Sequence, residues 1–198
     1  MTYDLLTALA AFAFVSSITP GPNNLMLMAS GANYGMRRTL PHMLGVALGF
    51  VFMVILVGVG LIQIFDMVPV TYTVLKVASV GYLLYLAWKI ATAATPETAE
   101  PTGTPFTFLQ AAAFQWVNPK AWTMALTAIS VYALPEAGIW GIFLVGFVFG
   151  AINLPSVGLW AWMGQQLRRM LDDPRKLRAF NITMAVLLVG SLYPILWP

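Results

Sequence analysis

The stretch Thr19-Pro20-Gly21-Pro22-Asn23-Asn24 lies at the middle of an uncharged segment that runs from Leu5 to Tyr34. As one straight helix this segment would be about 45 Å long, whereas the hydrocarbon core of a bilayer is about 30 Å thick. Pro22 has no N–H, and Pro20 disfavours helical geometry at the residue before it. Two prolines around a glycine therefore predict a membrane helix that is interrupted near its midpoint.

The composition identifies the membrane as the solvent. Only 9% of the 198 residues are charged and 60% are hydrophobic, whereas a soluble domain carries about 25% charged residues. Ten basic and seven acidic side chains are too few to cover a soluble core, and the high hydrophobic content excludes a disordered chain. The absence of cysteine excludes disulfides, thiol redox chemistry and cysteine-based metal sites.

Six segments are long and apolar enough to cross a bilayer, which needs about 20 residues. They are residues 5–34, 39–65, 67–88, 106–135, 137–167 and 179–198. The N-terminal segment contains Asp4 and lacks the basic start of a signal peptide, so we expect it to be retained as the first span. The expected fold is an all-α, multi-pass membrane protein with six transmembrane helices.

The charges predict the orientation of these spans. The loops after the first, third and fifth spans share one side of the membrane, and they carry Arg37, Arg38, Lys89, Arg168, Arg169, Arg175, Lys176 and Arg178. The other side has Lys76, near the start of the third span, with Asp4, Asp66 and Glu136. Cytoplasmic loops are enriched in Lys and Arg, so both termini are expected outside the cytoplasm. This placement explains the net charge of +3 without a nucleic-acid partner.

A second proline motif, Asn118-Pro119-Lys120, lies near the middle of the fourth span. Pro20 and Pro119 are 99 residues apart, which is half of the chain. An ordinary kink would explain either motif alone. The pair predicts two three-helix repeats of opposite orientation, because each has an odd number of spans. The boundaries are residues 1–94 for the first repeat, 95–105 for a cytoplasmic loop and 106–198 for the second. Inverted repeats with matched interruptions are typical of secondary transporters that bind substrate at the breaks.

Two further pairs of glycines occur in corresponding spans of the two halves, Gly45 with Gly49 and Gly146 with Gly150. Small residues at this spacing favour close helix packing, within one chain or between copies. Packing within the chain is the preferred interpretation, and a homodimer stays open.

Lys120 is the only charged residue deep inside a span. A charge at this depth costs roughly 2.5–3.5 kcal/mol on insertion scales and usually faces a functional cavity. Polar residues follow it on one helix face, at Thr123, Thr127 and Ser130, and a comparable row in the first span comprises Ser16, Thr19 and Asn23. These rows line either a common cavity or contacts between helices, which Ser, Thr and Asn also make. Gln115 and Asn118 add amide groups beside the second break, and Asn153 of the fifth span could reach the same cavity.

The ligand implied by these groups carries both charges. A carboxylate is expected at Lys120 and at the N–H groups of a broken helix. An ammonium is expected at carbonyls freed around Pro20–Pro22 and at the amides of Asn23, Asn24 and Asn118. Since no acidic residue lies deep in a span, a neutral amino acid is favoured. The predicted substrate-binding residues are Thr19, Pro20, Gly21, Pro22, Asn23, Asn24, Gln115, Asn118, Pro119, Lys120 and Thr123.

His42, the single histidine, lies near the cytoplasmic start of the second span. It is either a group that takes part in proton coupling or an interfacial residue without a role, and the second interpretation is favoured.

The sequence resembles the LysE/RhtB family of amino-acid exporters over essentially its whole length. The resemblance rests on residues 19–24, 35–38, 45–49, 81–89 (GYLLYLAWK) and 114–120 (FQWVNPK). It implies a bacterial inner-membrane protein that exports amino acids and is driven by the proton gradient. The termini, expected outside the cytoplasm from the charges, would then be periplasmic. The middle of the chain resembles members that export cysteine, O-acetylserine or other neutral amino acids. The interrupted-helix motifs of the family map onto Pro20–Asn24 and Asn118–Lys120.

Two other classes of function were weighed against export. An intramembrane enzyme would need a cluster of histidines and acids, and one interfacial histidine without a deep carboxylate argues against it. No catalytic residue, metal or cofactor is therefore expected. A membrane assembly or structural subunit that transports nothing stays open, and it predicts that Lys120 tolerates replacement by Leu or Met.

Overall fold

The computed structural model describes residues 2–61, 67–68, 70–93, 104–168, 170–171 and 173–193, and the regular elements in these ranges are all helical. The longer helices are α1 (Tyr3–Ile18), α2 (Pro22–Tyr34), α3 (Met36–Leu56), α5 (Val70–Ala91), α6 (Phe108–Phe114), α7 (Pro119–Tyr132), α8 (Gly138–Arg168) and α9 (Pro174–Gly190). The short helical turns are η1 (Val57–Leu61), η2 (Gln115–Val117) and η3 (Pro135–Ala137). Asp66, Arg169 and most of the predicted loop 95–105 lie outside the described residues. The all-helical prediction is confirmed.

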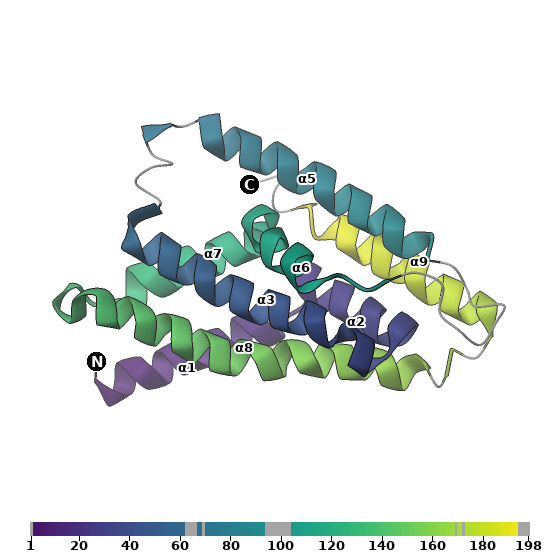
Figure 1. Cartoon of the computed structure of the whole chain (residues 1–198), viewed down its shortest axis with the longest axis horizontal. Coiled ribbons are helices and arrows are strands. Elements are labelled where there is room, and N and C mark those ends of the chain that lie inside the picture. The colour runs from purple at the N-terminus through teal and green to yellow at the C-terminus, as the bar shows by residue number, and fades with distance from the viewer. Residues whose placement is uncertain are drawn as a thin grey trace.

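The helices run back and forth along the long axis of the molecule (Figure 1). The C-terminal ends of α2, α5 and α8 and the N-terminal ends of α3 and α9 lie together at one end, and α1 begins at the opposite end (Figure 1). We call the first of these the basic end, because its helix termini carry Arg37, Arg38, Lys89, Arg168, Arg175, Lys176 and Arg178. The basic residues that the sequence assigned to one side are therefore clustered wherever the structure describes them.

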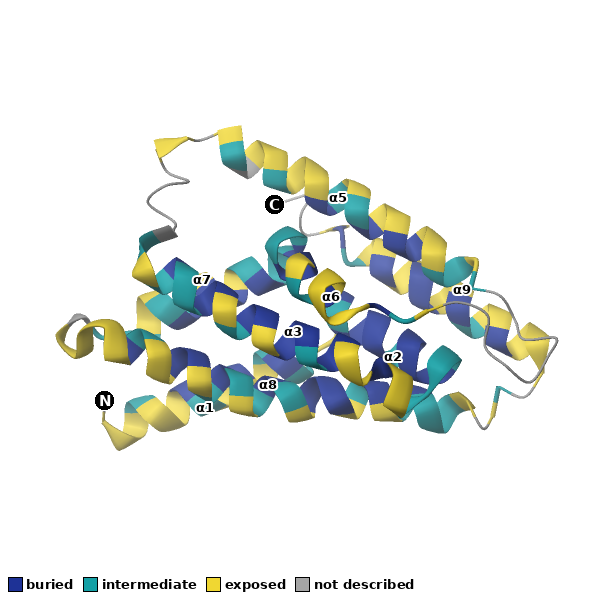
Figure 2. Cartoon of the chain, in the orientation of Figure 1, coloured by how far each residue is buried: buried dark blue, intermediate teal, exposed yellow. Residues whose placement is uncertain are grey.

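Three helices in the described ranges are long and apolar enough to cross a membrane, namely Met36–Gly60, Thr73–Ala91 and Gly138–Arg168. The bent pair of α1 and α2 raises this number to as many as four. Outward-facing positions on these helices are often large and apolar, such as Phe147 at 74% exposure and Val77 at 68% (Figure 2). Apolar side chains on the outside are suited to lipid, so the chain is a multi-pass membrane protein.

The packing is organised around α3 and α8, which lie against each other. α8 also packs on α1 and α2, α3 packs on α6 and α7, and α5 packs on α9. Glycines allow some of these helices to approach closely. A Cβ at Gly31 of α2 would overlap the carbonyl of Ala161 in α8, and one at Gly45 of α3 would overlap the carbonyl of Phe108 in α6.

The other glycines predicted to mediate packing also face helices of the same chain. Gly49 lies against Ala112 of α6, while Gly146 and Gly150 face Val51 of α3. The glycine pairs therefore pack within the chain, which is the preferred interpretation of the sequence pattern.

Candidate functional site

The first predicted break separates α1 from α2. α1 ends at Ile18, α2 begins at Pro22, and the two helices are bent by 54° relative to each other. Between them Thr19 (φ −65°, ψ 145°) and Gly21 (φ −178°, ψ 176°) have extended backbone. Pro22 occupies the first turn of α2, where a missing N–H costs no hydrogen bond.

The second break has the same plan at a different helix. α6 continues into the tight turn η2, which ends at Val117. Asn118 is extended (φ −95°, ψ 107°), and α7 begins at Pro119. The side-chain Oδ1 of Asn118 accepts a hydrogen bond from the backbone N–H of Lys120 at 3.2 Å and so caps α7. Each motif therefore places a proline at the start of a new helix inside the molecule.

Side chains from other helices satisfy the carbonyls at the end of α1. Asn24 donates through Nδ2 to the carbonyls of Ser17 and Thr19, each at 2.8 Å, and Trp160 of α8 donates through Nε1 to the carbonyl of Ile18 at 3.0 Å. Backbone groups freed in the membrane need such partners, because lipid offers none. The interruption is thus held by α2 and α8 as well as by its own sequence.

Lys120 supplies the remaining partner and ties the two breaks together. Its Nζ donates to the carbonyl of Thr19 at 2.7 Å, to Thr19 Oγ1 at 3.0 Å and to the carbonyl of Pro20 at 3.3 Å. The Gly21 carbonyl accepts from the N–H of Leu25 at 3.0 Å. The carbonyls of Pro20 and Gly21, which were expected to receive a substrate ammonium, thus each already accept one hydrogen bond within the chain, and their role in binding stays a prediction.

A cavity of about 340 Å³ lies between the two breaks, and we call it the break cavity. Its lining comes from α1, α2, α3, η2, α7 and α8 and comprises Ser16, Ser17, Gly21, Asn23, Asn24, Phe50, Gln115, Asn118, Lys120, Ala121, Met124, Asn153 and Val157. Asn23 and Gln115 exchange amide hydrogen bonds across it, at 2.8 and 3.2 Å. The two halves of the chain therefore build one polar cavity together.

The predicted site residues divide into three groups. Those that line the break cavity are Gly21, Asn23, Asn24, Gln115, Asn118 and Lys120. Thr19 contacts Lys120 from beside the cavity, while Pro20, Pro22 and Pro119 belong to the backbone of the two breaks. Thr123 is exposed outside it, and its hydroxyl donates to the Pro119 carbonyl at 3.1 Å.

Two buried acceptors in the cavity wall lack partners. Ser17 Oγ and Asn153 Oδ1 have no hydrogen-bond partner among the described residues, although Ser17 and Asn153 are only 4% and 5% exposed. Asn153 is the residue expected to reach the cavity, whereas Ser17 had not been predicted. The neighbouring residue Ser16 was predicted to face the cavity, and its hydroxyl donates to the Phe12 carbonyl of its own helix at 2.6 Å.

The charge distribution around the break cavity is one-sided. The N-termini of α2 and α7 both open onto it, and Lys120 lies at the same place. Helix N-termini carry partial positive charge and free N–H groups, which attract carboxylates. No Asp or Glu is among the described lining residues. The described lining therefore combines positive partial charge at the helix starts with two unpartnered oxygens, Ser17 Oγ and Asn153 Oδ1.

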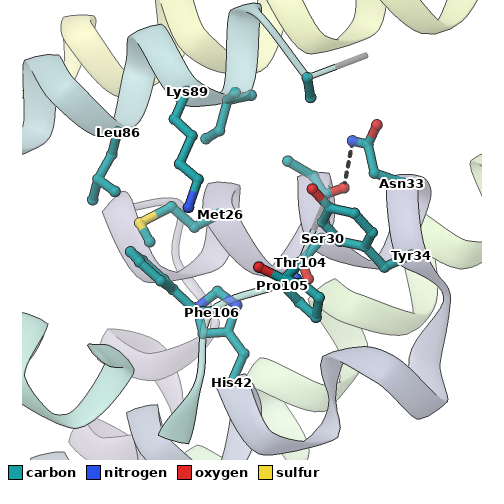
Figure 3. Close-up of a pocket in the computed structure, with 13 residues that line it drawn as sticks. Met26, Ser30, Asn33, Tyr34, His42, Leu86, Lys89, Thr104, Pro105 and Phe106 are labelled. Atoms are coloured by element: carbon teal, nitrogen blue, oxygen red, sulfur yellow. Dashed lines mark hydrogen bonds between the residues drawn. The ribbon is translucent and has the colours of Figure 1, made fainter. Parts of the chain in front are cut away.

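His42 lies in a different place from the other predicted residues. It is 2% exposed and so is buried within the chain; its depth in the membrane and its role stay predictions. Neither ring nitrogen has a hydrogen-bond partner among the described residues. His42 lines a second cavity, which we call the Lys89 pocket, with Met26, Ala29, Ser30, Asn33, Tyr34, Leu86, Lys89, Ile90, Ala93, Thr104, Pro105 and Phe106 (Figure 3).

Comparison with known proteins gives a consistent result. The family model of LysE type translocators matches residues 14–191. The chain is 30% identical over 190 residues, 96% of each chain, to proteins named cysteine/O-acetylserine efflux protein from Escherichia coli strain K12 and Shigella sonnei strain Ss046. No solved structure matches the chain significantly.

Proposed function

The chain belongs to the LysE type translocator family, and on this premise we propose that it exports a small neutral amino acid across the bacterial inner membrane. It is a transporter and not an enzyme. The relatives named for cysteine and O-acetylserine efflux make these two compounds, or close analogues, the first candidates for the substrate.

The observation that carries the proposal is the arrangement of donors and acceptors in the break cavity. The substrate carboxylate would bind the N–H groups that begin α2 and α7, and its ammonium would donate to Ser17 Oγ and Asn153 Oδ1. A neutral zwitterion suits this wall, since no carboxylate among its described residues could hold a second positive charge.

Lys120 would act as the link between substrate and conformation. Its ammonium now holds the carbonyls of Thr19 and Pro20, so α7 is fastened to the end of α1. A substrate carboxylate at the start of α7 would compete for this ammonium and loosen the fastening. Substrate would then favour the conformation in which the cavity opens, because it binds that conformation more tightly.

The pattern of helix contacts supports six spans arranged as two inverted repeats, about residues 1–94 and 106–198. In these repeats α1, α2 and α3 of the first half correspond to α6, α7 and α8 of the second. The packing of α8 on α1 and α2 therefore corresponds to the packing of α3 on α6 and α7. The same correspondence leaves the α3–α8 and α5–α9 contacts unchanged. In this arrangement the breaks after Ile18 and at Asn118 are equivalent positions, and movement of one repeat against the other exposes the cavity to either side.

The proposed driving force is the proton gradient, with both termini in the periplasm and the basic end in the cytoplasm. His42 is the candidate proton carrier, because it is buried and both of its ring nitrogens lack partners among the described residues. The basic end fits the cytoplasmic side by the positive-inside rule.

Transport in reconstituted vesicles tests this function. We expect labelled O-acetylserine, cysteine or alanine to move when a pH gradient is imposed, and labelled lysine to move much more slowly. Dissipating the gradient with a protonophore should stop net accumulation. If no amino acid moves in either condition, the chain is not an amino-acid exporter and the non-transporting subunit becomes the better interpretation.

A further inference from the structure

The Lys89 pocket is a second cavity, apart from the break cavity and near the basic end. It lies between α2, α3, α5 and the non-helical residues Thr104–Phe106 and is partly open to the outside. In Figure 3 the side chain of Lys89 extends from α5 across the pocket towards Met26 of α2, and His42 and Phe106 lie below it. None of these residues lines the break cavity.

Two polar side chains of this pocket, Ser30 and Asn33, have hydrogen-bond partners in neighbouring elements. Ser30 Oγ lies 2.8 Å from Thr39 Oγ1, and Asn33 Nδ2 donates to the carbonyl of Ala29 and to Asn181 Oδ1, each at 2.8 Å. Asn181 returns a hydrogen bond to Asn33 Oδ1 at 3.1 Å. These interactions fix the end of α2 against α3 and α9, so they form the frame of the pocket.

His42 and Lys89 are the two ionisable nitrogen groups of the described lining. His42 is 2% exposed, and neither ring nitrogen has a partner among the described residues, which is an unusual condition for a buried polar group. Lys89 is the only Lys or Arg among the described lining residues, and no Asp or Glu accompanies it. Its Nζ lies 5.8 Å from the ring centroid of Phe106. The His42 ring packs edge-on against the Phe106 ring, with 5.2 Å between the ring centroids.

Phe106 therefore contacts both groups, the exposed ammonium of Lys89 and the buried ring of His42, and both line the same pocket. A carboxylate there can accept from the ammonium of Lys89 and from the single N–H of a neutral His42, and hydrogen bonds with a charged partner are about twice as strong as neutral ones. The remaining wall, formed by Met26, Leu86 and Ile90, is apolar and suits a short aliphatic chain.

One face of α2 connects this pocket to the break cavity. Ser30 and Met26 line the Lys89 pocket, and Asn23 lines the break cavity. These residues are three or four positions apart and so lie on one side of the helix. From Ser30 to Asn23 the helix rises about 10 Å. Met26, 5% exposed, stands between the two sites, and its unbranched side chain can change rotamer without a backbone movement.

We propose that the Lys89 pocket is a second ligand site, which binds the carboxylate end of an amino acid at the basic end before the molecule moves along α2 to the break cavity. The identity of the ligand as an amino acid rests on the proposed function. The carboxylate chemistry of the site rests on Lys89, His42 and Phe106 alone.

The test is protection of a single cysteine placed in the pocket, which the cysteine-free chain makes possible. Ala93→Cys lies in the lining of the Lys89 pocket. Its alkylation by a maleimide is timed in purified protein, with propionate or n-propylamine, two probes of equal carbon number and opposite charge. We expect propionate to slow alkylation and n-propylamine and chloride to leave it unchanged. O-acetylserine should protect as propionate does.

Three backgrounds separate this site from the break cavity. Lys89→Gln should weaken protection by propionate about tenfold, as loss of one charge-assisted hydrogen bond would. Lys76 is an exposed lysine of the same helix that lines neither cavity, so Lys76→Gln should leave protection unchanged. Lys120→Met should also preserve protection, although it is expected to abolish transport.

The outcomes are decisive in each direction. Protection that disappears in Lys120→Met, or that chloride or n-propylamine gives equally, overturns the second site. In the absence of any probe, Ala93→Cys should be alkylated at the same rate with and without Lys89→Gln. Equal rates show that the pocket is still folded in the Lys89→Gln variant. If propionate protects but no amino acid is transported, the proposed function is rejected and the second site is kept. If an amino acid is transported but propionate gives no protection, the second site is rejected and the proposed function is kept.

Discussion

At the scale of single residues, Lys120 shows what a sequence can and cannot predict. It could be singled out because a lone charge deep in an apolar span needs a reason to be there. The direction of its ammonium could not be predicted, because its partners are 100 and 101 residues away and depend on how the two halves pack. The structure gives this lysine a partner in the first break in addition to its place in the cavity wall.

Ser17 and Trp160 were missed for a related reason. Helical periodicity placed Ser16 in the polar row, yet Ser16 bonds its own helix and Ser17 Oγ has no partner among the described residues. Trp160 looked like any other tryptophan of a membrane helix, whereas its indole N–H bonds the Ile18 carbonyl. Such roles depend on contacts between helices, which a one-dimensional pattern does not contain.

Asn153 gives a test at this scale. Asn153→Ala removes an acceptor proposed for the substrate ammonium, and a hydrogen bond to a charged group contributes about 1.5–3 kcal/mol. We expect KM for the transported amino acid to rise about 10- to 100-fold, with little change in the amount of folded protein. Initial rates of uptake over a range of substrate concentrations measure it.

The matched control is Ser156→Ala, three residues further along α8. Ser156 is also buried, but its hydroxyl donates to the Ile152 carbonyl of its own helix at 2.7 Å and does not line the break cavity. An equal rise in KM for both variants would show that Asn153 acts through packing.

At the scale of elements, the proline motifs predicted where α2 and α7 begin, because Pro fits the first turn of a helix and little else inside one. The fourth predicted span, 106–135, was less accurate. Its helical part begins only at Phe108, tightens at Gln115–Val117 and ends at Tyr132. Apolar composition sets the length that lies in lipid, but capping and tertiary contacts decide which part of it is helical.

The contact of α2 with α8 gives a prediction about an element. A Cβ at Gly31 would overlap the backbone of Ala161, whereas one at Gly81 of α5 meets no atom within 4 Å. Gly31→Ala should destabilise the protein by about 1–3 kcal/mol or more, as overpacking does. Gly81→Ala should be neutral or slightly stabilising, since Ala favours the helix by about 1 kcal/mol over Gly.

Thermal unfolding of the two purified variants in detergent measures the difference. If both alanines lower the melting temperature equally, close α2–α8 packing is not what Gly31 provides.

At the scale of the whole molecule, the distribution of basic residues carried more information than their number. The sequence assigned eight of them to one side, and those that the structure describes occupy helix termini at one end (Figure 1). The relation of the two halves is predicted from the positions of the prolines and of the glycine pairs, and it stays a prediction. Periodicity marks the faces of helices, but it does not say which face meets which neighbour.

The orientation of the molecule is testable with two single cysteines. Thr92→Cys lies at the basic end, after α5, and Ala137→Cys lies in η3 at the opposite end; both positions are exposed. A membrane-impermeant maleimide added to spheroplasts should label Ala137→Cys and should reach Thr92→Cys only after the membrane is permeabilised. Labelling in the reverse order would place the termini in the cytoplasm.

The central claim is that an amino acid crosses the membrane through the break cavity with Lys120 in contact with both breaks. Exchange of labelled for unlabelled O-acetylserine across reconstituted vesicles tests it without any gradient, so that coupling does not enter. The wild-type protein should exchange, and Lys120→Met should reduce exchange about 100-fold, since it removes hydrogen bonds from a charged group, each worth about 1.5–3 kcal/mol. Lys76→Met serves as the control and should exchange at the wild-type rate. Exchange by folded Lys120→Met at the wild-type rate would contradict the account.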